Sequence, residues 1–357
     1  MDSVIYNRFI LILVVIITFS CKTNYQEPVK LFENTKSLED KVFFSEEDIL
    51  NKPLQIINIG DQLLILDKFE IDEVSKIFMA INSESGKVQN NFGRIGRGPQ
   101  EFLFPSFLSK IHHQSNVFGI YNAQLFTFSI GDLESIESEK NVFIQSVYPE
   151  FDTRFSKITP VNSHEFIGSG FFKEGRYAIA DTTGKIKDIF GTYPFEKKHE
   201  LPRRVLGMAY QSIMEKHPQK PIFCSVTSRS ANLEIFRYQN GKFEVLKKVN
   251  SFPAKFENNS GNNRLSVSLE TENKMGYMDM TVTNDSIYLL YSGKTMDQNY
   301  RYADDILVFN WEGEPIIHYK VNSKLKKIAI NNENELYGIT KSANNEYSIL
   351  KYSIPAN

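Results

Sequence analysis

The chain has 357 residues, of which 41% are apolar and 13% aromatic, enough to bury a large core in one or two domains. Lys and Arg total 41 against 43 Asp and Glu, for a formal net charge of -2. Because a nucleic-acid binder needs a basic surface, this balance argues against DNA or RNA as a partner.

The N-terminus has the pattern of an export signal. Arg8 is followed by FILILVVIITF, an apolar run over residues 9–19 that is short for a bilayer span but suits the core of a secretory signal. Residues 1–20 are therefore predicted to be a signal peptide. The next pair, Ser20 and Cys21, resembles the lipobox of bacterial lipoproteins, in which the cysteine carries the acyl chains, palmitate among them. Two alternatives stay open, an ordinary cleaved signal and an uncleaved membrane anchor.

The rest of the chain divides into a short tether and one large domain. Residues 22–36 are polar and contain Pro28, which suits a segment that lifts a domain from a membrane. We expect 21–36 to be the lipidated N-terminus and tether, and 37–357 to fold as a single domain.

One pattern recurs through this domain: a β-rich run, a short turn that often contains glycine, and a second β-rich run. Runs of this kind occupy 55–67, 76–92, 117–130, 176–190, 233–249, 279–292, 305–321, 326–340 and 346–354. The glycines Gly86, Gly131, Gly184, Gly241 and Gly313 mark units of roughly fifty residues, close to a propeller blade of four antiparallel strands. Together with the runs after Lys326 they make six units. The expected fold is an all-β, six-bladed β-propeller.

One short inserted helix is expected from Leu206 to Lys216, ended by Pro218. Its apolar stripe, Leu206, Tyr210, Ile213 and Met214, is expected to pack against the propeller. Because an open propeller would expose strand edges, we also expect DKVFFSEE at 40–47 to join the last blade beside 347–354.

The stretch GRIGRGPQEFLFP, residues 93–105, stands where the chain must cross from the first blade to the second. Its glycines permit a sharp reversal, Pro99 fixes one φ, and Phe102 and Phe104 are expected to insert between the blades. A phosphate-binding loop would need a following helix and a Lys-Ser/Thr pair, and neither is present in the sequence.

These residues carry a family resemblance. Gly96, Gly98, Pro99, Glu101 and Phe102 resemble the blade junction of NHL-type propellers. With GRYAIADTTGKI at 175–186, ILVFNWEGEPI at 306–316 and Cys21, the whole layout is similar to the TolB-like six-bladed propeller lipoproteins of Bacteroidetes. The resemblance implies a propeller fold and a place in the cell envelope, and it supplies no catalytic residues.

The sequence indicates no catalytic or metal-binding constellation, and no cofactor is expected. Neighbouring strand residues such as His112 and His113 point to opposite faces, so this pair is expected in a surface loop. Asp304 and Asp305 lack the alternating oxygen ligands of a calcium loop and are expected to open a strand. Cys224 lies in the apolar run PIFCSV and is expected in the core.

Propellers commonly bind ligands where loops converge at the mouth of the central channel. Arginines and tyrosines can hold carboxylates or sugars there by forked hydrogen bonds and stacking. The candidate ligand-binding residues are Arg94, Arg97, Glu101, Tyr121, Arg229, Arg301 and Tyr302. In the alternative interpretation Glu101 binds backbone amides and each arginine braces the neighbouring blade.

The leading hypothesis is an envelope lipoprotein, anchored to a membrane on the periplasmic side or at the outer membrane. Its propeller would bind a protein, peptide or glycan without transforming it. The alternative is a propeller enzyme of lyase or lactonase type with a divalent metal at the central channel. A third interpretation is a scaffold in an envelope complex.

The lipid anchor is directly testable. Each buried methylene of an acyl chain contributes about 0.8 kcal/mol to membrane binding, so several chains hold a protein stably. Replacing Cys21 by serine should therefore release the protein from the membrane fraction or block its processing, as measured by fractionation and mass spectrometry. An unchanged distribution and unchanged mass would contradict the anchor.

Overall fold

The computed structural model describes most of the chain after residue 24. It covers residues 25–44, 50–67, 76–98, 101–103, 105–112, 116–134, 143–147 (backbone only), 155–261 and 264–355. The expected signal peptide 1–20 lies outside the described residues, as do Cys21, Pro99, Phe104 and His113. Among the helices that are described, none is long and apolar enough to cross a membrane.

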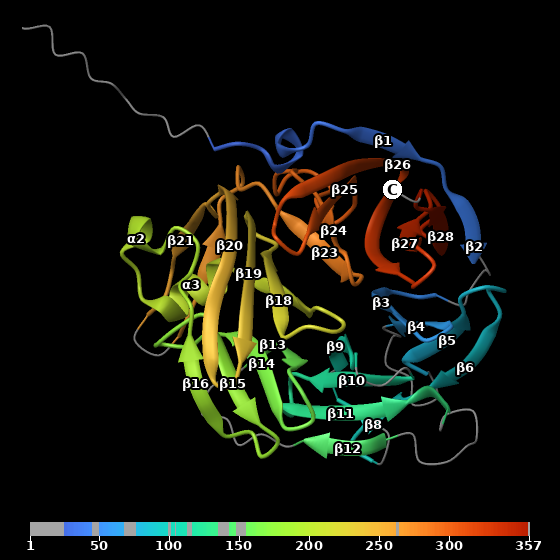
Figure 1. The fold of residues 1–357 in the computed structure, drawn as a ribbon, viewed down its shortest axis with the longest axis horizontal. Helices are drawn as coiled ribbons and strands as arrows, with labels where there is room; N and C mark the ends of the chain where they lie inside the picture. Colours follow the sequence, from blue (N-terminus) through green and yellow to red (C-terminus); the bar gives the residue numbers. More distant parts are fainter. Residues whose placement is uncertain are drawn as a thin grey trace, which may run out of the picture.

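Six four-stranded antiparallel units surround a common axis, so the prediction of an all-β six-bladed propeller is confirmed (Figure 1). The first three blades contain β3 (Pro53–Ile59), β4 (Gln62–Asp67), β5 (Phe78–Asn82) and β6 (Val88–Phe92); β9 (Pro105–Lys110), β10 (Val117–Asn122), β11 (Thr127–Asp132) and β12 (Phe143–Val147); and β13 (Phe155–Pro160), β14 (Glu165–Gly170), β15 (Tyr177–Asp181) and β16 (Ile186–Phe190).

The last three blades share one long strand. They contain β17 (Ser212–Lys216), β18 (Ile222–Thr227), β19 (Ala231–Gln239) and β20 (Lys242–Phe252); β23 (Tyr277–Val282), β24 (Ser286–Tyr291), β25 (Ala303–Asn310) and β26 (Pro315–Ile330); and the end of β26 with β27 (Glu335–Lys341), β28 (Tyr347–Ser353) and β2 (Lys41–Phe44). The first part of β26 pairs with β25 and its last part with β27, so this strand is the outer strand of blade 5 and the inner strand of blade 6.

The inner strands form a closed ring, in which β3, β9, β13, β17, β23 and β26 each contact the next and β26 contacts β3. A hydrophobic cluster fills each of the six interfaces between blades. Because both faces of a sheet are covered in this arrangement, a strand such as β4, QLLILD, is buried at every position. The apolar and aromatic side chains of the chain are therefore buried mainly in the interfaces between blades.

The ring closes as predicted. β2 adds to β28 in antiparallel register, with Lys41 opposite Lys351 and Val42 opposite Leu350. Phe44 is buried in the cluster between blades 6 and 1. The N-terminal strand thus completes the last blade, and no open edge remains there.

The described part of the expected tether lies against the propeller. The 3-10 helix η1 (Pro28–Leu31) packs on the cluster between blades 4 and 5, and the Phe32 ring lies 5.1 Å from Phe309. β1 (Thr35–Leu38) then pairs in parallel with the outer part of β26. In Figure 1 this segment runs along the outside of β26 toward β2.

The turn glycines behave as predicted. Gly86, Gly184, Gly241 and Gly313 have φ of 72°, 85°, 73° and 77°, a conformation that glycine adopts without strain. Gly131, which serves only as a marker of the repeat spacing, lies inside β11 and not in a turn. A Cβ at this position would approach the Phe118 ring to 2.5 Å, so the glycine makes room for an aromatic side chain.

Residues 93–105 cross from β6 to β9, as expected. Within the crossing, β7 (Arg94–Ile95) and β8 (Glu101–Phe102) form a small parallel pair. Phe102 is buried between blades 1 and 2, with its ring 5.3 Å from that of Phe78. The glycine-rich run is thus a blade junction.

The prediction of a helix from Leu206 to Lys216 is half wrong. The helix α3 spans Arg203–Ala209, and Ser212–Lys216 is the inner strand β17. Leu206 and Tyr210 are buried under the helix as expected, whereas Ile213 and Met214 lie on the strand. Pairing of β17 with β18 provides hydrogen bonds for the backbone of Ser212–Lys216. This tertiary pairing outweighs the helical spacing of the apolar residues. A second helix, α2 (Glu196–His199), was not predicted.

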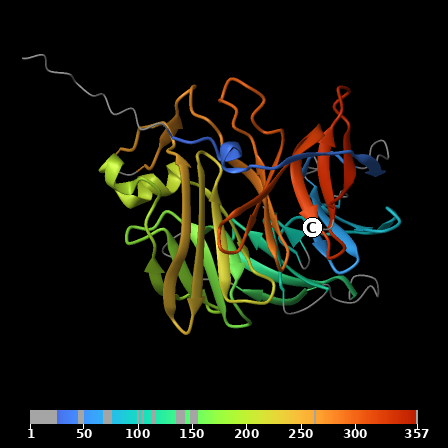
Figure 2. The ribbon, with the colours of Figure 1, turned by 45° about the horizontal axis from the view of Figure 1, so that its top comes forward.

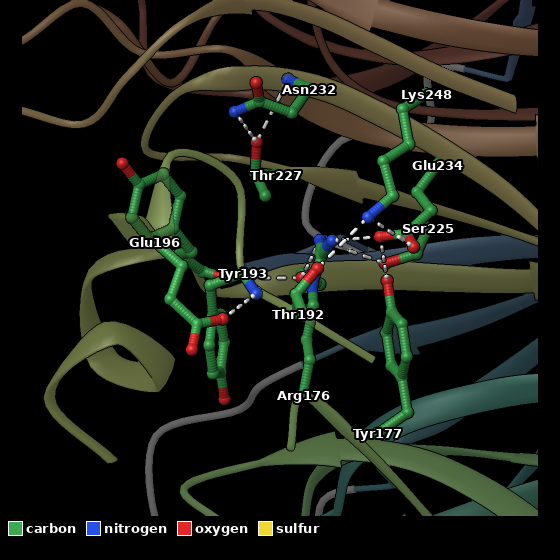
Figure 3. A network of polar contacts seen from close by, with 12 residues as sticks. Arg176, Tyr177, Thr192, Tyr193, Glu196, Ser225, Thr227, Asn232, Glu234 and Lys248 are labelled. Atoms are coloured by element: carbon green, nitrogen blue, oxygen red, sulfur yellow. Dashed lines mark hydrogen bonds and ion pairs between the residues drawn. The ribbon is translucent and has the colours of Figure 1, made fainter. Parts of the chain in front are cut away.

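A buried ion pair joins blades 3 and 4 (Figure 3). Arg176 donates from Nη1 to Glu234 Oε2 at 2.6 Å and from Nη2 to Ser212 Oγ at 3.0 Å. The Tyr177 hydroxyl donates to the same carboxylate at 3.2 Å, and Lys248 Nζ lies 3.5 Å from its other oxygen. Arg176 and Glu234 are 1% and 3% exposed, so each charged group is compensated by the other and would be destabilising if it were buried alone.

Replacing Glu234 by glutamine would leave the Arg176 charge without its counter-ion while keeping the shape of the side chain. We expect a loss of about 3 kcal/mol in the free energy of unfolding, measured by urea denaturation. The matched control is Glu244→Gln, which removes the ion pair between Glu244 and Arg237 at the surface. The Glu244 side chain is 60% exposed, so this substitution should change the free energy of unfolding little. Equal effects of the two substitutions would contradict the structural role of the buried pair.

Candidate functional site

The predicted residues of the first crossing lie together but differ in exposure. Arg94 and Arg97 are exposed, and Arg94 is the strand partner of Glu101. Glu101 accepts a hydrogen bond from the backbone N–H of Gly98 at 2.7 Å. A Cβ at Gly96 would lie 2.0 Å from Glu101 Oε2, so the absence of a side chain there admits the carboxylate. Glu101 thus binds a backbone amide and shapes the junction.

The other four candidates are distributed over three blades, with Arg301 and Tyr302 adjacent before β25. Tyr121 is buried, and its hydroxyl donates to the carbonyl of Phe155 at 3.0 Å, joining blades 2 and 3. Arg229 follows β18 and donates to the carbonyl of Met208 at 2.8 Å. Arg301 is exposed beside Tyr300, and burial raises the pKa of the neighbouring Tyr302.

None of the seven candidates is among the described residues that line two hollows of the structure. Ligand contact by the seven residues stays a prediction. Other residues line the two hollows and determine what each of them can bind.

The larger hollow is a cleft of about 970 Å³, at the side of blade 4. Its walls are the N-terminal residues 25–30, the end of α2 at Lys198 and His199, and the chain from Glu270 to Lys274. Residues 252–256, which lead into β21 (Phe256–Asn258), also line it. β21 pairs with β22 (Val267–Leu269) as a small hairpin between blades 4 and 5. Figure 2 shows the helices, in yellow-green, and the blue N-terminal segment near the same end of the propeller.

The N-terminal wall of this cleft is fixed by direct contacts. Glu27 forms an ion pair with Lys274 and accepts a hydrogen bond from the Tyr291 hydroxyl at 2.6 Å. Lys198 Nζ donates to the Tyr25 hydroxyl at 3.0 Å. These contacts hold the N-terminal segment against blade 5 and α2, so the cleft has a defined shape.

Four charged side chains face this cleft with no ion pair among the described residues: Lys30, Lys255, Glu270 and Glu272. Aromatic groups adjoin them, since Phe252 and Phe256 line the same space and the His199 ring lies 5.1 Å from Phe256. Burial lowers the pKa of His199, which therefore stays neutral near pH 7. The cleft thus offers cations, carboxylates and apolar contact in one place.

The second hollow is lined by Lys110, at the end of the inner strand β9. Four further inner strands also carry a charged residue, although these four residues do not line the hollow. Lys110, Lys157, Glu215, Asp279 and Lys327 come from β9, β13, β17, β23 and β26. Because the axis is where all inner strands meet and these groups interact electrostatically, we place them around the channel. We call these five residues the channel ring.

Only one pair in the channel ring is in direct contact. Lys327 Nζ lies 3.2 Å from Asp279 Oδ1, and Asp279 also accepts from the backbone N–H of Ile328 at 2.9 Å. Lys157 Nζ lies 4.2 Å from the centre of the Phe107 ring. Burial raises the pKa of Glu215 to about 8 and lowers that of Lys157 to about 8.

The donor set of the channel ring does not fit a divalent cation. Three lysines stand among two carboxylates, and ammonium groups repel a metal ion. In the part of the chain that the structure describes, no group of three His, Cys, Asp or Glu side chains is placed to hold a metal. Asp304 and Asp305 lie in β25, as expected, and form ion pairs with Lys320. Cys224 is buried as expected, and burial raises the pKa of its thiol.

A pattern in the sequence does mark the channel ring, although the repeat of β-rich runs and turn glycines does not reveal it. Each of these charges interrupts the first strand of a blade, as in PSFLSK for Lys110 and SIMEK for Glu215. No comparable signal exists for the cleft, because its walls come from residues 25–30, 198–199 and 252–274, which only the folded chain brings together.

The closed ring of inner strands and the six four-stranded units define a six-bladed β-propeller. The family model for TolB-like 6-blade propeller-like proteins matches residues 32–333, and the chain belongs to this family.

Two crystal structures are similar in fold. A member of the DUF4221 family from Bacteroides vulgatus is 11% identical, with 94% of this chain and 100% of that chain covered at a TM-score of 0.58. A protein from Bacteroides fragilis described as exported is 12% identical, with 90% and 100% covered at a TM-score of 0.54. No curated protein matches the chain significantly.

The raised pKa of Glu215 predicts a pH dependence of stability. Between its ordinary value near 4.5 and about 8, the folded state binds more protons than the unfolded state, so stability falls as pH rises through this window. Glu215→Gln removes the titration while keeping the side chain's shape. The stability advantage of the natural protein over this variant should therefore shrink by about 3 kcal/mol between pH 5 and pH 8, as measured by urea denaturation. Parallel pH profiles would show that Glu215 is not held protonated.

Proposed function

We propose that this protein is an exported, lipid-anchored binding protein of the bacterial cell envelope, and that its cleft holds a peptide segment of another envelope protein. The export signal pattern, Cys21 and membership of the TolB-like family support the location. The observation that carries the function is the cleft of about 970 Å³, with unpaired charges of both signs beside aromatic side chains.

A peptide fits this combination better than a glycan. A neutral glycan needs aromatic faces and hydrogen bonds but gains nothing from four separate charges, each of which keeps its water unless a counter-charge replaces it. A peptide carries amines, carboxylates and apolar side chains along one chain. Lys30 and Lys255 can bind its carboxylates, and Glu270 and Glu272 its cations.

The direct test places a photo-crosslinking amino acid at position 255 in the full chain and irradiates intact cells. We expect adducts with a defined peptide segment of an envelope protein, identified by mass spectrometry. The matched control is position 242, which is exposed at the β19–β20 turn, far along the strands from the cleft, and should give no such adduct.

A second variant separates specific binding from proximity. Replacing Glu270 and Glu272 together by lysine should reduce the yield of the position-255 adduct at least tenfold while the melting temperature stays the same, because both residues are exposed. Adducts unaffected by this reversal, adducts equally strong at position 242, or adducts only with glycan would overturn the proposal.

A further inference from the structure

The mouth of the central channel forms a small cavity of about 160 Å³, separate from the cleft. Its walls are the ends of the inner strands of five blades and the turns that follow them, including Asn58, Lys110, Pro218, Asn284 and Asn332. At about 30 Å³ for each water molecule, the cavity has room for about five waters or one small anion.

Lys110 is the one Lys, Arg, Asp or Glu among the described residues that line this cavity. It ends β9, lines the cavity and interacts electrostatically with Glu215 of the channel ring. Among the described residues it has no ion pair within 4.0 Å. The cavity therefore has a lysine that no carboxylate among the described residues contacts directly, although Glu215 interacts with it electrostatically and burial lowers its pKa.

The channel ring behind Lys110 adds to this positive potential. Its three lysines outnumber its two carboxylates, and the Asp279 carboxylate is already occupied by Lys327. Burial raises the pKa of Glu215 and lowers the pKa values of Lys110 and Lys157, and Glu215 partly offsets the effect of burial on both lysines. An excess of cations in a narrow channel of low dielectric attracts a counter-anion strongly.

The rim of the cavity offers hydrogen-bond donors of the right kind. Asn284 and Asn332 are exposed residues of its lining, and each carboxamide has two N–H donors. Neither side chain has a hydrogen-bond partner among the described residues. Ammonium and amide N–H groups together are the donors that oxyanions accept from.

We propose that the channel mouth is a binding site for a small oxyanion, a carboxylate or phosphate group, held by Lys110 with Asn284 and Asn332. The group belongs either to a free ion or to the end of a larger ligand that reaches into the mouth. This site is independent of the peptide cleft, since the two hollows share no residue.

Isothermal titration calorimetry of the full chain with inorganic phosphate and with acetate, at constant ionic strength, tests the proposal. We expect saturable binding of at least one of the two probes, with one site per chain. Binding of both indicates general oxyanion recognition, whereas binding of phosphate alone or acetate alone assigns the site to that group.

Variants locate the site. Lys110→Met should weaken the binding at least tenfold, and Asn284→Asp should weaken it as well, because it brings a carboxylate to the rim without changing the core. Lys242→Met removes an exposed lysine elsewhere and should leave the affinity unchanged. Absence of saturable binding to both probes, or equal affinity in the natural protein and the two site variants, would overturn the proposal.

Discussion

The pairing of β2 with β28 joins the two ends of the described chain into one sheet, with Lys41 opposite Lys351. A propeller blade buries its apolar faces only against its two neighbours, so a ring that stays open would leave one cluster half exposed and one strand edge unpaired. Phe44 completes the cluster between blades 6 and 1, which is the last of the six interfaces. Both hollows depend on this closure, because the channel needs all six inner strands and the cleft needs the N-terminal segment held in place.

The inner strands present a second problem, since their edges facing the axis have no further strand to pair with. Side chains of neighbouring inner strands satisfy these groups: Gln55 both donates to and accepts from the backbone of Leu108, at 2.8 and 2.7 Å, and Lys326 donates to the carbonyl of Pro53 at 2.6 Å. Buried backbone groups require such partners. The polar residues of the axis therefore stabilise the contacts between inner strands. The charged residues without such a contact, above all Lys110, are the ones available to a ligand.

Local patterns predicted the blades well, because a hairpin is set by residues close in sequence. Gly86, Gly184, Gly241 and Gly313 mark real turns, and Phe102 fills the blade junction as expected. The pattern misled where tertiary packing decides: Ser212–Lys216 reads as the end of a helix but is the inner strand of blade 4. The cleft was not predictable, since its walls meet only after the ring has closed. Of the seven predicted ligand residues, Tyr121, Glu101 and Arg229 have hydrogen bonds to the backbone of the chain itself.

The most direct test of this account is amide hydrogen exchange of the full chain, followed by mass spectrometry over residues 41–44 and 347–353. If β2 closes the ring, the amides of Lys41–Phe44 that pair with β28 are protected and exchange only with opening of the whole blade, as slowly as those of β28. Exchange of 41–44 at the rate of an unstructured peptide, with β28 still protected, would contradict closure and with it the placement of both hollows.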